Sequence, residues 1–250
     1  MKYDVLQKDF YKGDLKIDGQ LFLPDQKRSA LLIISHGFGG NRSRGVSYAK
    51  LFASKGIAVY VYDFIGGGPD IKSDGDMLHM SVLTEADDLR IILDGLLKMD
   101  YIDSKNVFLS GRSQGGYVST LVASDRKEEI RGMVLLYPAY VIQDHMLELI
   151  KNGKQFEKEF EFLNNRVSDL YGKDAVSVDI FEKIREYDED VLIIHGDADD
   201  IVPIRYSYEA VKTFPHARLE VIEGAGHGFE GEDDDRAKKL TLDFVLERLI

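Results

Sequence analysis

The sequence predicts an α/β protein with a doubly wound, mostly parallel sheet, an antiparallel N-terminal edge and an inserted helical cap. Short apolar runs of strand length alternate with amphipathic stretches of helix length, a pattern typical of parallel strands that are buried on both faces. Before them the chain alternates apolar and polar residues around turns, and one later connection is far longer than the rest. A chain of 250 residues is long enough for one domain with a substantial core.

The N-terminal segment predicts an antiparallel meander at the edge of the sheet. Residues 3–11 and 15–23 have the composition of strands and are separated by the turn residues Gly13 and Asp14. The second stretch ends at Pro24, which cannot donate a hydrogen bond within a strand.

The rest of the sheet is predicted from six continuous apolar runs, each of about four to eight residues, which is the length of a buried strand. The helices are predicted from the amphipathic stretches between and after these runs. The strands are expected at residues 30–35, 57–62, 106–110, 131–136, 191–195 and 218–222, and the helices at 45–55, 81–99, 115–124, 204–214 and 234–249.

The connection between residues 136 and 191 spans about fifty residues, well above the usual loop length. We interpret residues 139–187, approximately, as a small, mostly helical cap within a single domain that spans residues 1–250. Two roles fit the aromatic side chains of this segment equally well, either lining an acyl or aryl pocket or forming a core for the cap. These residues are Phe156, Phe160, Phe162, Tyr171, Phe181 and Tyr187.

Composition excludes several classes of function. A formal net charge of −12 argues against nucleic-acid binding, which needs clustered Lys and Arg. The absence of cysteine excludes a disulfide, a thiolate nucleophile or a cysteine-based zinc site. Neither a secretory signal nor an apolar stretch long enough for a membrane span is present, so the default expectation is a cytoplasmic protein without a membrane span. The sequence leaves the oligomeric state open.

The motif with the most specific chemistry is G-R-S-Q-G-G at residues 111–116, which follows a predicted strand and precedes a predicted helix. It matches G-x-S-x-G in the strand-turn-helix context that this motif requires. The flanking glycines remove side chains that would collide with the neighbouring strand and helix, and the tight turn projects the serine hydroxyl towards a helix N-terminus. Ser113 is therefore the predicted nucleophile.

A serine hydroxyl needs a general base, and His227 is the best candidate among six histidines. It lies in the loop G-A-G-H-G-F at residues 224–229, directly after the last predicted strand. Loops that follow the carboxyl ends of parallel strands share one edge of the sheet. We therefore expect His227 to meet Ser113 there.

A third group, a carboxylate, must orient the histidine and stabilise its protonated form. Residues 195–203 read H-G-D-A-D-D-I-V-P and follow a predicted strand that ends at the same edge. Three acids of this loop, Asp197, Asp199 and Asp200, are candidates, and the residues alone do not choose among them. The resulting order along the chain is serine, acid, histidine.

The developing oxyanion needs donors that are already oriented, and backbone N–H groups serve this purpose best. One is expected from Gln114, the residue after the nucleophile. The other is expected from the loop H-G-F-G-G at residues 36–40, after the first buried strand, where we assign the N–H of Phe38.

With these motifs in place, the sequence resembles serine esterases of the α/β-hydrolase fold over essentially its full length. It is most similar to the bacterial feruloyl (cinnamoyl) esterases and the monoacylglycerol-lipase-like carboxylesterases. The resemblance implies that Asp199, the fifth residue of H-G-x-x-D, is the acid. One segment departs from the family: residues 63–75 replace D-x-x-G-x-G-x-S with a longer, reshaped loop, so substrate specificity does not carry over from relatives.

The expected function is hydrolysis of a carboxylic ester through an acyl-enzyme, with a small acyl or aryl group, hydroxycinnamoyl included, on the substrate. Two alternatives stay open, namely a serine peptidase or amidase of the same fold and a non-catalytic ligand-binding homologue. The partner expected in either catalytic case is a small molecule. The acyl group, the alcohol and the preference for esters over amides are not predicted.

Neither a metal nor a cofactor is predicted. His79, His145 and His216 lack other ligands at metal-binding spacing. The glycine-rich stretches at residues 37–43 and 66–68 lack the G-K-[ST] of a phosphate loop. His36 is interpreted as a structural support for the oxyanion loop, and His195 as a residue at a strand end.

Overall fold

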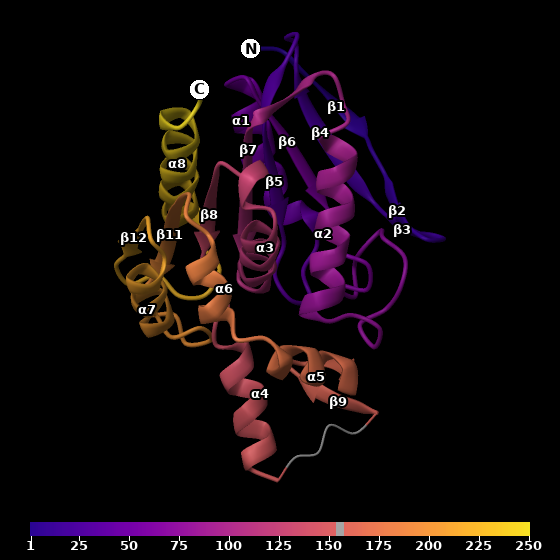
Figure 1. Cartoon of the computed structure of the whole chain (residues 1–250), viewed down its shortest axis with the longest axis vertical. Helices are drawn as coiled ribbons and strands as arrows, with labels where there is room; N and C mark the ends of the chain where they lie inside the picture. Colours follow the sequence, from indigo (N-terminus) through magenta and orange to yellow (C-terminus); the bar gives the residue numbers. More distant parts are fainter. Residues whose placement is uncertain (154–157) are drawn as a thin grey trace.

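The computed structural model describes residues 1–153 and 158–250, and its main feature is an eight-stranded sheet (Figure 1). The strand order is β1-β4-β6-β5-β7-β8-β11-β12. The pairs β1/β4 and β4/β6 are antiparallel and the others are parallel, which confirms the predicted fold class. The strands are β1 (Tyr3–Gln7), β4 (Gly19–Pro24), β5 (Ser29–Ser35), β6 (Ile57–Tyr62), β7 (Ile102–Arg112), β8 (Gly132–Leu136), β11 (Asp190–Gly196) and β12 (Ala217–Ile222).

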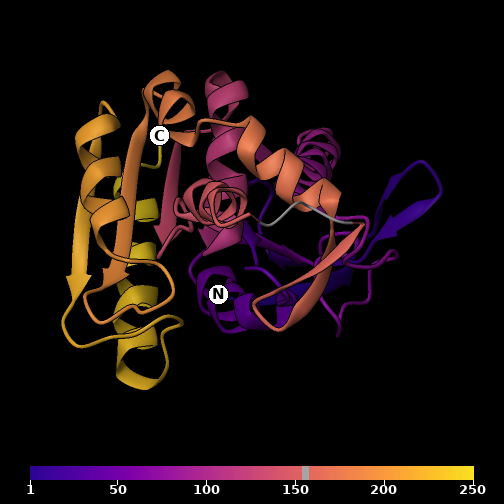
Figure 2. The same cartoon turned by 90° about the horizontal axis from the view of Figure 1, so that it is seen from below.

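Helices cover both faces of the sheet, as Figure 2 shows from below. The strand β5 explains this arrangement, because all seven of its residues are buried and successive side chains point to opposite faces. Leu31 and Ile33 belong to one core cluster, and Leu32 and Ile34 to the other. On one face lie α1 (Val46–Ser54) and α8 (Gly231–Glu247), and on the other α2 (Val82–Leu96), α3 (Gln114–Asp125), α6 (Ile180–Glu186) and α7 (Arg205–Thr213).

The predicted N-terminal meander is wrong in one part. Strands β2 (Phe10–Lys12) and β3 (Leu15–Ile17) pair only with each other, as a separate hairpin, while β1 pairs with β4 at the edge of the main sheet. The hairpin is anchored through Phe10, whose ring packs against Tyr60 at 5.6 Å between centroids. The same ring lies so close to Gly95 of α2 that any side chain at this position would collide with it.

The segment between β8 and β11 lies at the carboxyl ends of the parallel strands, at the lower end of Figure 1. As predicted, the segment is mostly helical and contains α4 (Ile142–Lys151), α5 (Asp169–Ser177) and α6. It also contains a hairpin that was not predicted, formed by β9 (Glu159–Phe162) and β10 (Asn165–Ser168). The hairpin turns at Leu163 and Asn164, whose φ angles of 47° and 61° suit a two-residue turn. A Leu-Asn pair is a weak turn signal. Phe156 lies outside the described residues.

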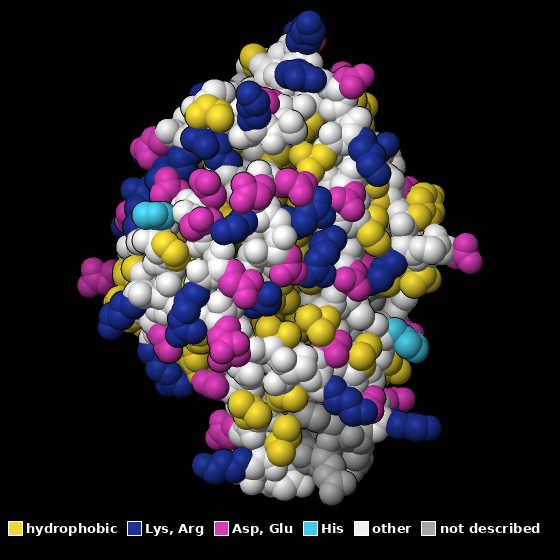
Figure 3. Space-filling view, viewed as in Figure 1, with side chains coloured by type: hydrophobic (Ala, Val, Ile, Leu, Met, Phe, Trp, Pro, Cys, Tyr) yellow, Lys and Arg dark blue, Asp and Glu magenta, His cyan; other side chains and the backbone are white. Residues whose placement is uncertain are grey.

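The surface carries charges of both signs. In Figure 3, basic and acidic side chains are interspersed over the face shown rather than gathered into one patch, which is typical of a solvated surface. None of the helices in the described ranges is long and apolar enough to cross a bilayer.

Candidate active site

Ser113 occupies a strained turn between β7 and α3. Its φ of 52° lies in the left-handed region, which is costly for a residue with a side chain. A Cβ on Gly111 would collide with the peptide of Gly115, and one on Gly115 would collide with the carbonyl of His36. Two hydrogen bonds fix the turn from outside, from Ser113 N–H to the Leu136 carbonyl at 2.9 Å and from Ala139 N–H to the Ser113 carbonyl at 3.0 Å.

The structure brings the predicted nucleophile, base and acid together from the ends of three strands. His227 Nε2 lies 3.1 Å from Ser113 Oγ, and His227 Nδ1 lies 2.7 Å from Asp199 Oδ2. With a proton on Nδ1, the imidazole donates to the carboxylate and presents the lone pair of Nε2 to the hydroxyl. This is the arrangement that activates a serine.

Among the three candidate acids, only Asp199 has this contact. Its side chain is fully buried, and its Oδ1 accepts hydrogen bonds from the N–H groups of Ile201 and Val202. Burial alone would raise the pKa of Asp199, but hydrogen bonds from His195 and His227 hold it well below its usual range.

The other two acids point elsewhere, and both are exposed. Asp197 accepts a hydrogen bond from Gly224 N–H at 2.6 Å. It thereby ties the acid loop to the loop that carries His227.

His195 has a contact that the sequence analysis missed. This fully buried imidazole lies at the end of β11, as expected, but its Nε2 is 3.2 Å from Asp199 Oδ2 and 2.9 Å from the Val202 carbonyl. Its Nδ1 is 2.6 Å from Ser207 Oγ. A neutral imidazole with its proton on Nε2 satisfies all three contacts and donates to the acid. The sequence signal that could have indicated this contact is the four-residue spacing between the histidine and the aspartate of H-G-x-x-D.

The loop predicted to supply an oxyanion donor, residues 36–40, lies directly against Ser113. A Cβ placed on Gly37 would be 3.1 Å from Ser113 Cβ. Within the described part of the chain, the N–H groups of Phe38 and Gln114 have no acceptor, which leaves both available as donors, as predicted for an oxyanion hole.

His36 supports this loop through two hydrogen bonds, in agreement with the structural role predicted for it. Its Nδ1 lies 2.8 Å from the Gly37 carbonyl, and its Nε2 accepts a hydrogen bond from Phe64 N–H at 3.1 Å. Burial lowers the pKa of His36, although the Gly37 carbonyl and Asp63 oppose that shift. A neutral imidazole satisfies both contacts.

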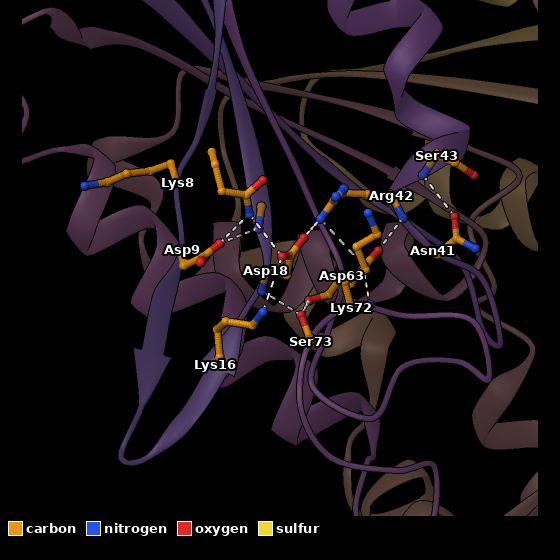
Figure 4. Close-up of polar contacts among 12 residues, drawn as sticks. Lys8, Asp9, Lys16, Asp18, Asn41, Arg42, Ser43, Asp63, Lys72 and Ser73 are labelled. Atoms are coloured by element: carbon orange, nitrogen blue, oxygen red, sulfur yellow. Dashed lines mark hydrogen bonds and ion pairs between the residues drawn. The ribbon is translucent and has the colours of Figure 1, made fainter.

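The reshaped loop at residues 63–75 supports the oxyanion loop from the outside (Figure 4). The Asp63 carboxylate accepts from the N–H groups of Arg42 and Lys72 at 2.6 and 2.8 Å. The guanidinium of Arg42 pairs with Asp18 and lies 3.8 Å from Asp63. In addition, Gly39 N–H donates to the carbonyl of Gly67 at 3.0 Å, so the two loops are joined directly.

This ion-pair network predicts a large loss of stability for Arg42→Met. The side chain of Arg42 is 10% exposed, and its removal leaves the buried carboxylate of Asp63 without a cation and that of Asp18 with only Lys16, at 3.5 Å. We expect the free energy of unfolding in urea to fall by about 3–5 kcal/mol. Arg44→Met is the matched control, because this side chain is 69% exposed and faces an exposed Glu230. Its effect should stay within about 0.5 kcal/mol, and equal losses for both variants would contradict the prediction.

Two pockets meet at Ser113 and share Phe38. One is a cavity of about 330 Å³ with a polar wall that includes His36, Arg44, His227 and Glu230. The other is a much smaller apolar cavity of about 20 Å³ beneath the inserted segment. It is lined by Phe38, Ser113, Gln114, Ala139, Val141, Ile142, His145, Phe162, Leu163, Tyr171, Ile201 and Val202.

The aromatic residues of the inserted segment that the structure describes, Phe160, Phe162, Tyr171, Phe181 and Tyr187, all pack in or against the core. Two of them, Phe162 and Tyr171, also line the apolar pocket. Among the residues described, no group of three His, Asp or Glu side chains is placed to hold a metal ion.

Comparisons with known proteins agree with this geometry. The family model described as serine aminopeptidase, S33, matches residues 26–190, more than half of the chain, and one described as alpha/beta hydrolase fold matches residues 161–232. The chain is 26% identical over 257 residues to putative esterase/lipase 2 of Mycoplasma genitalium, with 90% of each chain covered. It is 29% identical over 134 residues to mouse monoglyceride lipase, a match that covers 51% of this chain and 41% of that protein.

Among solved structures, the chain is similar to Est1E from Butyrivibrio proteoclasticus with ferulic acid bound. The TM-score is 0.88 at 23% sequence identity, and the match covers 96% of this chain and 98% of that one. At this level of identity the likeness shows a shared fold.

Proposed function

The chain belongs to the α/β-hydrolase family described as serine aminopeptidase, S33, and from this premise we propose that it is a serine carboxylic-ester hydrolase. The observation that carries the proposal is the continuous contact from Ser113 through His227 to Asp199, at 3.1 and 2.7 Å. The similarity to an esterase/lipase over nearly the whole chain supports an ester as the substrate.

In the proposed reaction, Ser113 Oγ attacks the ester carbonyl while His227 Nε2 takes its proton. The N–H groups of Phe38 and Gln114 stabilise the resulting oxyanion. Collapse of the tetrahedral intermediate breaks the bond to the alcohol oxygen, which receives the proton from His227. Water then attacks the acyl-enzyme with His227 as base, which releases the carboxylic acid and restores Ser113.

The two pockets fit the two halves of an ester. The departing alcohol oxygen must lie near His227, which lines the polar pocket and not the apolar one. The alcohol therefore occupies the polar pocket, and the acyl group points towards the apolar cavity beneath the inserted segment. That cavity holds about 20 Å³, so an acyl group longer than acetyl requires its walls to move apart. Phe162 and Tyr171 give that pocket aromatic walls suited to an alkyl or aryl acyl group.

An aminopeptidase reaction is the runner-up, because the family description favours it. An aminoacyl group would place an ammonium in the acyl pocket, where a buried charge needs an opposite charge. No carboxylate lies among the described residues that line this pocket. This observation favours esters with uncharged acyl groups.

A panel of substrates tests the proposal. We expect hydrolysis of p-nitrophenyl esters and methyl ferulate, and kcat/KM for an aminoacyl p-nitroanilide at least about 100-fold lower, since an unpaired buried charge costs several kcal/mol. Cleavage of the anilide at a rate comparable to the best ester would favour the peptidase assignment.

Filling the apolar pocket should change acyl preference without damaging the triad. Ile142 lines this pocket and is 4% exposed, so Ile142→Trp places an indole in the space proposed for the acyl group. We expect kcat/KM for p-nitrophenyl octanoate and methyl ferulate to fall by about 10-fold or more, with p-nitrophenyl acetate changed by less than about threefold. Equal losses on acetate and octanoate would show that this pocket does not hold the acyl group.

A further inference from the structure

The side chain of Gln114 is held at both ends by buried groups that the proposed chemistry does not use. Its Nε2 donates to Glu85 Oε2 at 2.8 Å, and its Oε1 accepts from the Tyr171 hydroxyl at 2.7 Å. All three side chains are at most 1% exposed. The proposed reaction needs only the backbone N–H of Gln114, so these two hydrogen bonds require another explanation.

Tyr171 also contacts the other residue assigned to the oxyanion hole. Its ring packs edge-on against the ring of Phe38, with 5.5 Å between centroids and 61° between planes. Phe162 makes a similar contact with Phe38 at 5.4 Å. One side chain from α5 in the inserted segment therefore touches both residues that supply the oxyanion N–H groups.

Glu85 is a buried hydrogen-bond acceptor whose surroundings favour the protonated form. Burial raises its pKa well above the ordinary value, the hydrogen bond from Gln114 opposes that shift, and Asp88 adds to it. Within the described part of the chain, Glu85 forms no ion pair and its Oε1 has no hydrogen-bond partner. The contribution of Glu85 is therefore a fixed acceptor for the Gln114 amide rather than a charge.

We infer that Glu85 and Tyr171 are positioning residues that hold Gln114 and Phe38 in place, and through them the two N–H groups of the oxyanion hole. The inference rests on the proposed function. It makes the inserted segment a part of the catalytic centre as well as a wall of the pocket. Oxyanion stabilisation depends on donors fixed before charge develops, so a small loss of order lowers kcat and leaves the binding of the uncharged ester almost unchanged.

Tyr171→Phe tests the hydrogen bond alone, because it keeps the ring that contacts Phe38. With p-nitrophenyl acetate, whose acyl group is too short to depend on the pocket wall, we expect kcat to fall about 10-fold and KM to change less than twofold. Tyr187→Phe is the matched control. It removes one buried hydroxyl of the same inserted segment, bonded to the Ile130 carbonyl at 3.0 Å, and should leave kcat unchanged.

Inhibitors separate positioning from general loosening of the fold. A trifluoromethyl ketone adds to the serine and places an oxyanion in the hole, whereas the matched methyl ketone binds mainly as an uncharged ligand. In Tyr171→Phe the inhibition constant of the trifluoromethyl ketone should rise by the same factor as kcat/KM falls, and that of the methyl ketone should not change.

Glu85 has its own test. Glu85→Gln preserves the shape and acceptor of a neutral carboxyl and should keep kcat within about twofold, whereas Glu85→Leu removes the acceptor and should lower kcat about 10-fold.

The raised pKa of Glu85 adds a second readout, the pH dependence of stability. Above the ordinary pKa of glutamate, the unfolded chain releases a proton that the folded chain retains. Wild-type stability should therefore fall with rising pH relative to Glu85→Gln, until the folded protein also ionises.

The outcomes are distinct. If the wild type hydrolyses p-nitrophenyl acetate while Tyr171→Phe matches Tyr187→Phe in kcat and in both inhibition constants, the inference is wrong and the proposed function stands. If Glu85→Leu does not fold, Tyr171→Phe and Glu85→Gln still decide the matter. If the wild type hydrolyses no ester, both proposals fail together.

Discussion

Ser113→Ala should lower ester turnover by about 10⁶-fold, to the level supported by the oxyanion hole and substrate binding alone. The reason is that, among the described residues, Ser113 carries the hydroxyl that contacts His227 Nε2, at 3.1 Å. The melting temperature should stay near that of the wild type, because the side chain is only partly buried and lies on an elbow held by backbone hydrogen bonds.

The matched control is Ser119→Ala, in the helix that follows the elbow. Its hydroxyl is buried without a hydrogen-bond partner among the described residues, so its removal should leave both turnover and stability nearly unchanged. Initial rates with p-nitrophenyl butyrate measure both variants. Residual turnover in Ser113→Ala above about one part in a thousand of wild type would contradict the assignment of the nucleophile.

Asp199→Asn should lower kcat by about 10⁴-fold, the second largest effect expected. The amide is nearly isosteric, but where it meets His227 Nδ1 with its NH₂ group it favours the tautomer that carries the proton on Nε2, which cannot accept the proton of Ser113. The change also weakens the two donations that the carboxylate receives from His195 and His227.

Two neighbouring acids provide controls in the same loop. Asp200→Asn should have almost no effect, because the side chain is exposed to solvent. Asp197→Asn weakens the contact with Gly224 N–H, so a loss of stability of about 1 kcal/mol is expected with little change in kcat. A collapse of kcat in either control, with Asp199→Asn near normal, would show that the orienting acid has been misassigned.

The parts of the fold that the sequence predicts best are those whose pattern is local. The strand β5 is a continuous apolar run because both of its faces are buried, and Ser113 and His227 follow strands that end at one edge of the sheet. The turn at Gly13 and Asp14 was predicted, but the separation of β2 and β3 from the main sheet was missed because it depends on distant packing. The hairpin at Leu163 was missed because its turn signal is weak.

Contacts between distant segments were not predictable from patterns. Glu85 looks like an ordinary polar position of an amphipathic helix, and nothing local indicates that it is buried against Gln114. Tyr171 was recognised only as one of several aromatic residues, because its two roles depend on how α5 docks onto the elbow. His195 was placed correctly at a strand end, but its contact with Asp199 depends on the path of the loop between them.

The central claim, that the reaction passes through an acyl group on Ser113, is tested most directly by rapid acid quenching during hydrolysis of p-nitrophenyl acetate, followed by peptide mass spectrometry. We predict that an acetyl group appears within the first turnover on the peptide that contains Ser113, and that it is absent from Ser113→Ala treated in the same way. Sustained hydrolysis with that peptide unmodified throughout, or with the acetyl group on a different residue, would contradict the account.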